Sequence, residues 1–294
     1  MRKVIKTCSF RIIQGEHYFC VIGNKLSIYR ISDMERVCTF SDMKYYSCGN
    51  FVDDTTFVAR NTIGIYKVYD IEKVICIKTI QFDEIDQSGQ DSEFILSPKK
   101  DYLFDILDCR ERSDMRFYKI EIATGEASFL TIHNLMRVSK FLTYDEQNNS
   151  VRFVNSLFNV LEVNLDSMTI KTAYYDSLQL ILEAHLFFDN RYVLNKKMEI
   201  IDIETKTLIR KIDYRFVTNQ HSYLVSTSLH NNNQHLAIVY SDKIVILDFI
   251  SGKVLFEYTD KYCSCVCFVG DYLLLGTWTK VVIIDNPLLK PASV

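Results

Sequence analysis

The sequence predicts an all-β fold: a seven-bladed β-propeller of four-stranded antiparallel blades, its ring closed by the N-terminal strand. Three observations lead to this prediction. A strand–turn–strand phrase occurs seven times along the 294 residues. Six steps from Asp33 to Asp285 cover 252 residues, so the mean period is 42. Two further strand-like stretches precede each copy, and four strands in about 40–45 residues are typical of a propeller blade.

Each copy of the phrase consists of an alternating apolar run, a short polar turn and a return strand. Alternation with period two predicts a strand with one face more buried than the other. The turns often hold Asp, Thr, Ser or Gly, which favour chain reversal. The seven copies begin at Leu26, Ile65, Phe117, Val160, Glu199, Ile244 and Val281.

The seventh copy, Val281 to Asp285, stops at Pro287 without a return strand. A spare strand-like stretch, Arg2 to Lys6, stands at the other end of the chain. We expect this stretch to complete the seventh blade, because the backbone groups of an open edge then gain hydrogen-bond partners. Leu288 and Leu289 are an alternative source of the strand, which the neighbouring prolines disfavour.

One stretch conflicts with the repeat. Leu178 to Leu186 consists of good helix formers, yet its place in the repeat requires the inner strand of the fifth blade. We follow the repeat and predict a strand there. The whole chain, 1–294, is predicted to form a single domain.

Composition and charge exclude several classes of protein. The formal charge is −3 and 48% of the residues are hydrophobic, so we expect a packed core and no nucleic-acid partner. No apolar run is long enough for a membrane span or a secretory signal. Nine cysteines are an odd number, which favours reduced thiols over a disulfide framework. These features together predict a cytoplasmic protein.

Four of the repeated strands end in an apolar residue followed by Asp, and one turn runs from Asp248 through Ser251-Gly252 to Lys253. In these features the whole chain resembles the WD-repeat and YVTN-type propeller superfamily. It lacks the Trp-Asp and Gly-His pairs of that family, and its only tryptophan is Trp278. The resemblance therefore implies the propeller architecture and assigns no functional residue. The four strand ends are Tyr69-Asp70, Ile201-Asp202, Leu247-Asp248 and Ile284-Asp285.

Cys263, Cys265 and Cys267 form the most conspicuous cluster of chemically reactive side chains. On a strand they share one face at about 6.6–6.8 Å per step, which is too wide for thiolates around one tetrahedral metal. We expect small core thiols that face a neighbouring blade.

Two other clusters carry potential metal ligands. His221, His230 and His235 match no ligand template, and we expect surface histidines. The acidic insert before the third blade is expected to be a solvated loop, because it lacks the spacing and the glycine of a calcium loop. Its carboxylates are Asp83, Glu84, Asp86, Asp91 and Glu93. We therefore predict no metal site.

Candidate binding residues gather where the second strand of a blade connects to the third. In a propeller these connections emerge on one face, so basic side chains there can converge on an anion or an acidic peptide. An exposed tryptophan in the same class of connection suits an interface hot spot. Independently solvated charges are the alternative. The candidates are Arg60, Arg110, Arg112, Arg116, Lys196, Lys197 and Trp278.

The sequence contains none of the local motifs of a nucleophile, a phosphate-binding loop or a zinc protease. We therefore predict no catalytic residue and no cofactor. The predicted function is a non-catalytic protein-binding platform that uses the loops of one face to bind another protein. Two alternatives stay open: a small-molecule-binding or hydrolytic propeller with a site at the central channel, and an obligate subunit of a fixed complex. The sequence leaves the oligomeric state open.

Overall fold

The fold was analysed in a computed structural model of the chain. The structure describes residues 2–83, 85, 93–108, 114–133, 138–155, 160–174, 184–188, 192–195, 197–202, 205–212, 224–230, 234–286 and 288.

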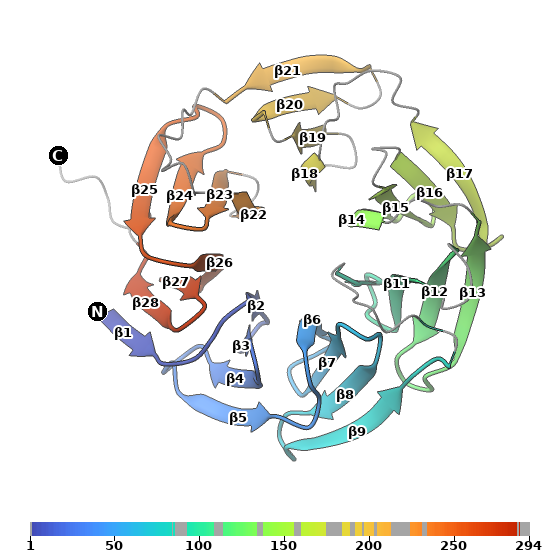
Figure 1. The fold of residues 1–294 in the computed structure, drawn as a ribbon, viewed down its shortest axis with the longest axis horizontal. Coiled ribbons are helices and arrows are strands. Elements are labelled where there is room, and N and C mark those ends of the chain that lie inside the picture. The colour runs from blue at the N-terminus through green and yellow to red at the C-terminus, as the bar shows by residue number, and fades with distance from the viewer. Residues whose placement is uncertain are drawn as a thin grey trace. The chain divides into compact units, whose positions relative to one another are not determined.

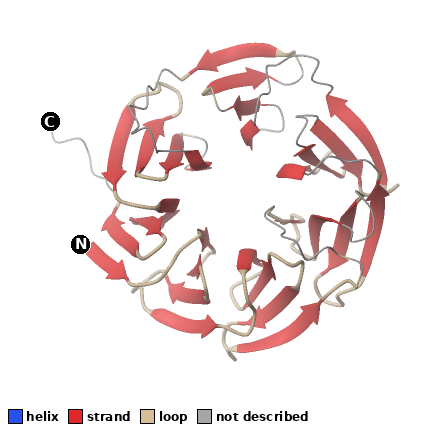
Figure 2. Cartoon of the chain, in the orientation of Figure 1, coloured by secondary structure: helices blue, strands red, loops and turns tan. Residues whose placement is uncertain are grey.

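The predicted fold class is confirmed: the chain is a seven-bladed β-propeller with four antiparallel strands in each blade. Strands and loops account for all of the described structure, as Figure 2 shows. No helix among the described residues is long and apolar enough to cross a membrane. The chain divides into two compact units. Whether it forms one domain, as expected, stays a prediction.

Unit 1 comprises Met1–Tyr46, Ile71–Val74 and Asp213–Val294. It holds blades 1, 6 and 7, whose strands are labelled in Figure 1. Blade 1 consists of β2 (Arg11–Gln14), β3 (Tyr18–Ile22), β4 (Leu26–Arg30) and β5 (Arg36–Phe40); blade 6 of β22 (Leu224–His230), β23 (His235–Tyr240), β24 (Lys243–Asp248) and β25 (Val254–Thr259); and blade 7 of β26 (Cys263–Val269), β27 (Tyr272–Thr277), β28 (Val281–Asp285) and β1 (Arg2–Ile5).

Unit 2 comprises Ser47–Asp70 and Ile75–Ile212 and holds blades 2 to 5. Blade 2 consists of β6 (Tyr46–Phe51), β7 (Thr56–Asn61), β8 (Tyr66–Asp70) and β9 (Ile75–Ile80); blade 3 of β10 (Ile95–Leu96), β11 (Tyr102–Asp108), β12 (Met115–Glu121) and β13 (Ala127–Ile132); blade 4 of β14 (Val138–Asp145), β15 (Ser150–Asn155), β16 (Val160–Asn164) and β17 (Thr169–Tyr174); and blade 5 of β18 (Ala184–Phe188), β19 (Tyr192–Asn195), β20 (Glu199–Asp202) and β21 (Thr207–Lys211).

The N-terminal strand completes blade 7, as the sequence predicts. β1 pairs antiparallel with β28, from Arg2 opposite Ile284 to Ile5 opposite Val281 (Figure 1). The outer edge of β28 is thereby covered, and blade 7 has four strands like the others. β1 occupies the place beside β28 for which Leu288 and Leu289 were the alternative; Leu288 lies in a turn, and Leu289 lies outside the described residues.

The hydrophobic cores lie between adjacent blades of the same unit. In unit 1, Phe19 and Tyr29 of blade 1 pack with Leu274 and Ile283 of blade 7. In unit 2, Val58 and Tyr66 of blade 2 share a core with Leu103 and Tyr118 of blade 3. Middle strands are buried on both faces, whereas the outer strands β9 and β21 are largely exposed. This packing holds the loops at the strand ends in fixed positions.

The stretch of helix formers before blade 5 is only partly described. Residues 184–188 form strand β18, which confirms the prediction for that part. Residues 178–183 lie outside the described residues.

Candidate interaction surface

Trp278 and Tyr262 form a stacked aromatic pair on the loops of blade 7. Trp278 lies in the turn between β27 and β28, and Tyr262 directly precedes β26. Their rings are 5.5 Å apart, with an interplanar angle of 15°. The Trp278 backbone N–H donates to the Tyr262 carbonyl oxygen over 3.1 Å. Although the rings contact each other, Trp278 is 51% exposed and Tyr262 57%.

The turn that carries Trp278 is fixed by the buried residue Thr277. The Thr277 backbone N–H donates to the Lys280 carbonyl oxygen over 2.8 Å. Its hydroxyl oxygen also accepts from the Lys280 N–H over 3.1 Å. Because Thr277 is only 1% exposed, these bonds form away from solvent and hold the tryptophan in place.

Asp260 connects the two loops on which the aromatic residues lie. It accepts hydrogen bonds from the Lys280 ammonium group at 2.7 Å and from the Tyr258 hydroxyl at 2.7 Å. Burial acts to raise the pKa of Asp260, but these two donors and the Lys261 N–H outweigh it and hold the pKa below its usual value. The carboxylate therefore stays ionised and fixes the Lys280 side chain beside the aromatic pair.

Tyr262 was missed in the sequence, although an internal repeat marks it. Lys261-Tyr262-Cys263-Ser264-Cys265 matches Lys44-Tyr45-Tyr46-Ser47-Cys48 at four of five positions. In both copies the tyrosine adopts a left-handed backbone, with φ of 60° at Tyr262 and 58° at Tyr45. This conformation is uncommon for a tyrosine, and both side chains are exposed. Comparing the connections between blades would have shown the motif.

Arg60 does not lie on an exposed loop, where the sequence placed it. It is the last but one residue of β7 and is completely buried. Its guanidinium donates to Asp105 of β11 over 2.5 Å, and the Tyr66 hydroxyl donates to the same carboxylate oxygen over 2.6 Å. Arg60 is therefore part of the interior of unit 2 and is not available to a partner.

The chemistry of this buried cluster is structural. Burial acts to lower the pKa of Arg60, but the attraction of Asp105 outweighs it and raises the pKa above the usual value. Asp105 also accepts from the Ile106 N–H over 2.8 Å. The three donors satisfy the buried carboxylate, and we assign the ion pair no catalytic role.

The other predicted binding residues lie in unit 2 or outside the described residues. Arg116 lies within strand β12, half-buried, with its guanidinium carbon 4.4 Å from the centre of the Phe129 ring. Lys197 is exposed in the turn between β19 and β20. Arg110, Arg112 and Lys196 are not among the described residues. Binding by the candidates other than Arg60 stays a prediction.

The three cysteines of β26 do not share one face. A register shift between Cys263 and Cys265 places Cys263 in the core between blades 6 and 7. Cys265 and Cys267 pack in the core between blades 7 and 1. Burial raises the pKa of Cys263 and Cys265 to about 11 and that of Cys267 to about 12. All three are protonated core thiols, as expected. The expectation that they share one face is wrong, because regular strand alternation does not predict the register shift.

The histidines and the acidic insert are only partly described. His230 is half-buried and not on the surface as expected: its ring lies 4.4 Å from Phe268 and its Nε2 lies 2.9 Å from the Ser228 hydroxyl. His221 lies outside the described residues, as do Glu84, Asp86 and Asp91 of the insert.

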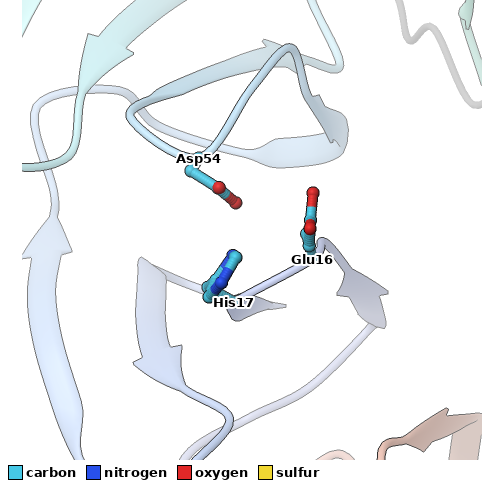
Figure 3. A group of neighbouring side chains, drawn as sticks. All are labelled: Glu16, His17 and Asp54. Carbon is cyan, nitrogen blue, oxygen red and sulfur yellow. The ribbon is translucent and has the colours of Figure 1, made fainter.

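Figure 3 shows Glu16 and His17 in the turn between β2 and β3, and Asp54 in the turn between β6 and β7. The first two residues belong to unit 1 and Asp54 belongs to unit 2. We assign no metal site to them.

Comparison with known proteins adds no family: no family model matches the chain, and no curated protein matches its sequence.

Proposed function

We propose that this chain is a non-catalytic protein-binding platform of the cytoplasm, a divergent WD-repeat-like propeller that binds another protein through loops at one end of its strands. The observation that carries the proposal is the exposed Tyr262–Trp278 pair. Buried tryptophan and tyrosine side chains dominate the binding energy of many protein interfaces. A pair already stacked on fixed turns loses little conformational entropy when a partner covers it.

The loops differ from the strands in a way that supports this function. Near Trp278 the polar groups of Thr277 and Asp260 fix the backbone, while the aromatic rings are left exposed to solvent. Exposed rings on ordered turns contribute little to folding, because about half of each side chain stays in water. A partner that covers these rings would remove from water apolar area that stays exposed in the folded chain, and this would contribute to the binding free energy.

The test is affinity capture of the tagged full chain from its native host, with mass spectrometry of the bound proteins and metal analysis of the same sample. The variant Tyr262→Ala/Trp278→Ala should lose a stoichiometric partner that the wild type retains. Ile250→Ala is the matched control, because Ile250 is also an exposed large apolar residue, at 66%, on a loop at the opposite strand ends of unit 1.

Two results would overturn the proposal. One is a partner that binds the aromatic double variant as well as it binds the wild type. The other is a stoichiometric metal with no protein partner, which would favour the small-molecule or hydrolytic alternative.

A further inference from the structure

Six loops of unit 1 meet at the end of the strands that carries Trp278. In blade 7, residues 260–262 and 278–280 lie together through the Trp278 to Tyr262 hydrogen bond. The Ser9 N–H donates to the Thr277 carbonyl oxygen over 3.1 Å and thereby adds loop 6–10. The Asp260 N–H donates to the Asp242 carbonyl oxygen over 3.2 Å and adds turn 241–242. Loops 23–25 and 41–45 leave blade 1 at the same end, where Leu26 pairs with Phe40. We call these six loops the lysine end.

Three loops of the lysine end, those that lead into β2, β6 and β26, carry a lysine at an equivalent position. Lys6, Lys44 and Lys261 each stand three residues before a serine, in the stretches Lys6-Thr7-Cys8-Ser9, Lys44-Tyr45-Tyr46-Ser47 and Lys261-Tyr262-Cys263-Ser264. All three lysines are exposed. None of them forms an ion pair with another residue that the structure describes. The repeat therefore presents three ammonium groups on equivalent loops of one end.

The opposite strand ends of unit 1 carry the opposite charge. The loops of the lysine end hold five lysines and three aspartates. The described loops at the other ends, residues 15–17, 31–35, 71–74, 249–253 and 270–271, hold five carboxylates and two lysines. Two of these carboxylates are already paired, Glu35 with Lys3 at 2.8 Å and Asp33 with Arg30 at 2.6 Å. Among the described loops of unit 1 the positive charge is thus concentrated on one end, where three lysines form no ion pair with another described residue.

Exposed aromatic side chains follow the same distribution. Among the described residues, four of the five exposed aromatic side chains, Phe10, Tyr45, Tyr262 and Trp278, lie on the lysine end, and the fifth is Phe129 of unit 2. Among the described residues, the opposite loops of unit 1 expose two large apolar side chains, Val74 and Ile250, and neither is aromatic. Lysines and aromatic rings together fit a ligand that carries both negative charge and an apolar side chain.

We propose that the lysine end binds an acidic segment of a partner protein, with carboxylates near Lys6, Lys44 and Lys261 and a large apolar side chain on the Tyr262–Trp278 pair. This inference rests on the proposed function and adds the chemistry of the partner to it. The ammonium groups raise the rate of association and select against basic partners, while the aromatic pair supplies the area that is desolvated on binding.

The same surface elements occur in proteins that bind single-stranded nucleic acid, but here the charges favour a protein. Asp42, Asp242 and Asp260 are interleaved with the lysines, whereas a continuous phosphate backbone is best matched by uninterrupted positive charge. The chain as a whole also carries a net charge of −3. A peptide can place a neutral residue opposite each aspartate, whereas a phosphate backbone cannot.

The experiment selects random-sequence phage-displayed peptides on the full-length chain. We expect the selected peptides to be enriched in Asp and Glu and to contain a large apolar residue. A labelled peptide from the selection is then titrated by fluorescence anisotropy. The variant Lys6→Glu/Lys44→Glu/Lys261→Glu should bind it at least about 10-fold more weakly. Affinity should also fall with rising ionic strength.

The matched control is Lys99→Glu/Lys206→Glu/Lys253→Glu, which changes the net charge equally through exposed lysines elsewhere. It should keep the affinity of the wild type within about 2-fold. A peptide whose Asp and Glu are replaced by Asn and Gln tests the same contacts without altering the protein. It should bind the wild type as weakly as the first lysine variant binds the original peptide.

Three outcomes would overturn the inference: no selected peptide, selected peptides without an acidic excess, or equal binding by the two lysine variants. Tighter binding of labelled oligouridylate than of any selected peptide would assign the lysine end to nucleic acid instead. If peptide binding depends on Trp278 but not on the lysines, the proposal that the partner segment is acidic is wrong, and the proposed function stands. If it depends on neither, the proposed function fails as well.

Discussion

Arg60 of unit 2 and Trp278 of unit 1 have the same origin in the sequence, yet the structure gives them opposite environments. Both stand near the connection between the second and third strands of their blades. Arg60 still belongs to the strand, where it pairs with Tyr66, and its side chain is completely buried. Trp278 comes after the last residue of β27 and is half exposed. A shift of two positions along the repeat separates a residue of the core from one that faces solvent.

The counterpart of Arg60 in blade 7 shows how much one position of the repeat varies. Gly276 pairs with Val281 as Arg60 pairs with Tyr66, in the last ladder position before the turn. A Cβ atom added to Gly276 would lie 2.3 Å from Cys265 Sγ and 2.9 Å from Ser9 Oγ. At Gly276 of blade 7, neighbouring side chains therefore fill the space that Arg60 occupies in blade 2.

The largest effect should come from breaking the buried pair. Asp105→Asn leaves the Arg60 charge in the core without its counter-ion, and we expect the free energy of unfolding to fall by about 3–5 kcal/mol. Urea denaturation followed by circular dichroism measures this change. Asp33→Asn is the control, since it breaks the exposed pair with Arg30 and should leave the midpoint unchanged. Equal effects of the two variants would remove the distinction between buried and exposed charges.

Deletion of Met1 to Lys6 should have the next largest effect. It removes β1 and reopens the edge of β28. Each ladder hydrogen bond contributes about 1 kcal/mol net, so we expect a loss of about 2–4 kcal/mol. A chain shortened by Pro291 to Val294 serves as the control. An unchanged melting temperature after the N-terminal deletion would contradict the closure of blade 7 by β1.

The half-buried His230 should make stability depend on pH. Burial, with a smaller contribution from His235, lowers the pKa of His230 from 6.5 to about 4. The unfolded chain therefore takes up the proton first, and stability is lost as the pH falls below about 6.5.

Between about pH 7 and about pH 5 this loss should be about 2 kcal/mol larger in the wild type than in His230→Gln. Glutamine keeps a polar group near Ser228 but does not titrate. Parallel stability curves for the two proteins over this pH range would show that His230 keeps its ordinary pKa.

The smallest effect on stability should come from Trp278→Ala. Because half of the side chain is already in water, we expect the free energy of unfolding to change by less than about 0.5 kcal/mol. The same variant should weaken partner binding, since Trp278 supplies the exposed ring of the proposed surface. A large loss of stability would show that Trp278 has a structural role, like Arg60, and would contradict its assignment to the binding surface.

The fold was predictable because it depends on periodicity. Alternating apolar residues, turn residues and a count of strands were enough to find the seven strand–turn–strand phrases. The same count identified Arg2 to Lys6 as the strand that completes blade 7. The environment of single residues was not predictable in the same way. Arg60 is buried because Asp105, 45 positions later, lies opposite it, and no local pattern shows such a contact. The register shift at Cys263 likewise reverses a face that simple alternation assigns.

The candidate surface was partly predictable. Trp278 stood out as the only tryptophan and lay in a connection, so its exposure followed from the repeat. Tyr262 and Lys261 became visible only when the connections between blades were compared, because they precede a strand instead of following one. The left-handed backbone at Tyr45 and Tyr262 has no signal in the residue type, since glycine or asparagine would be expected there.

The pairing of β1 with β28 also orders events during folding. Arg2 and Ile284 are neighbours in one sheet but lie at nearly opposite ends of the chain. A ribosome makes β1 long before β28, because 275 residues lie between the two strands. Blades 1 to 6 consist of consecutive strands and can form as the chain emerges, whereas blade 7 must wait for a contact of very large sequence separation. Completion of blade 7 is therefore the step at which loop-closure entropy slows the maturation of this protein.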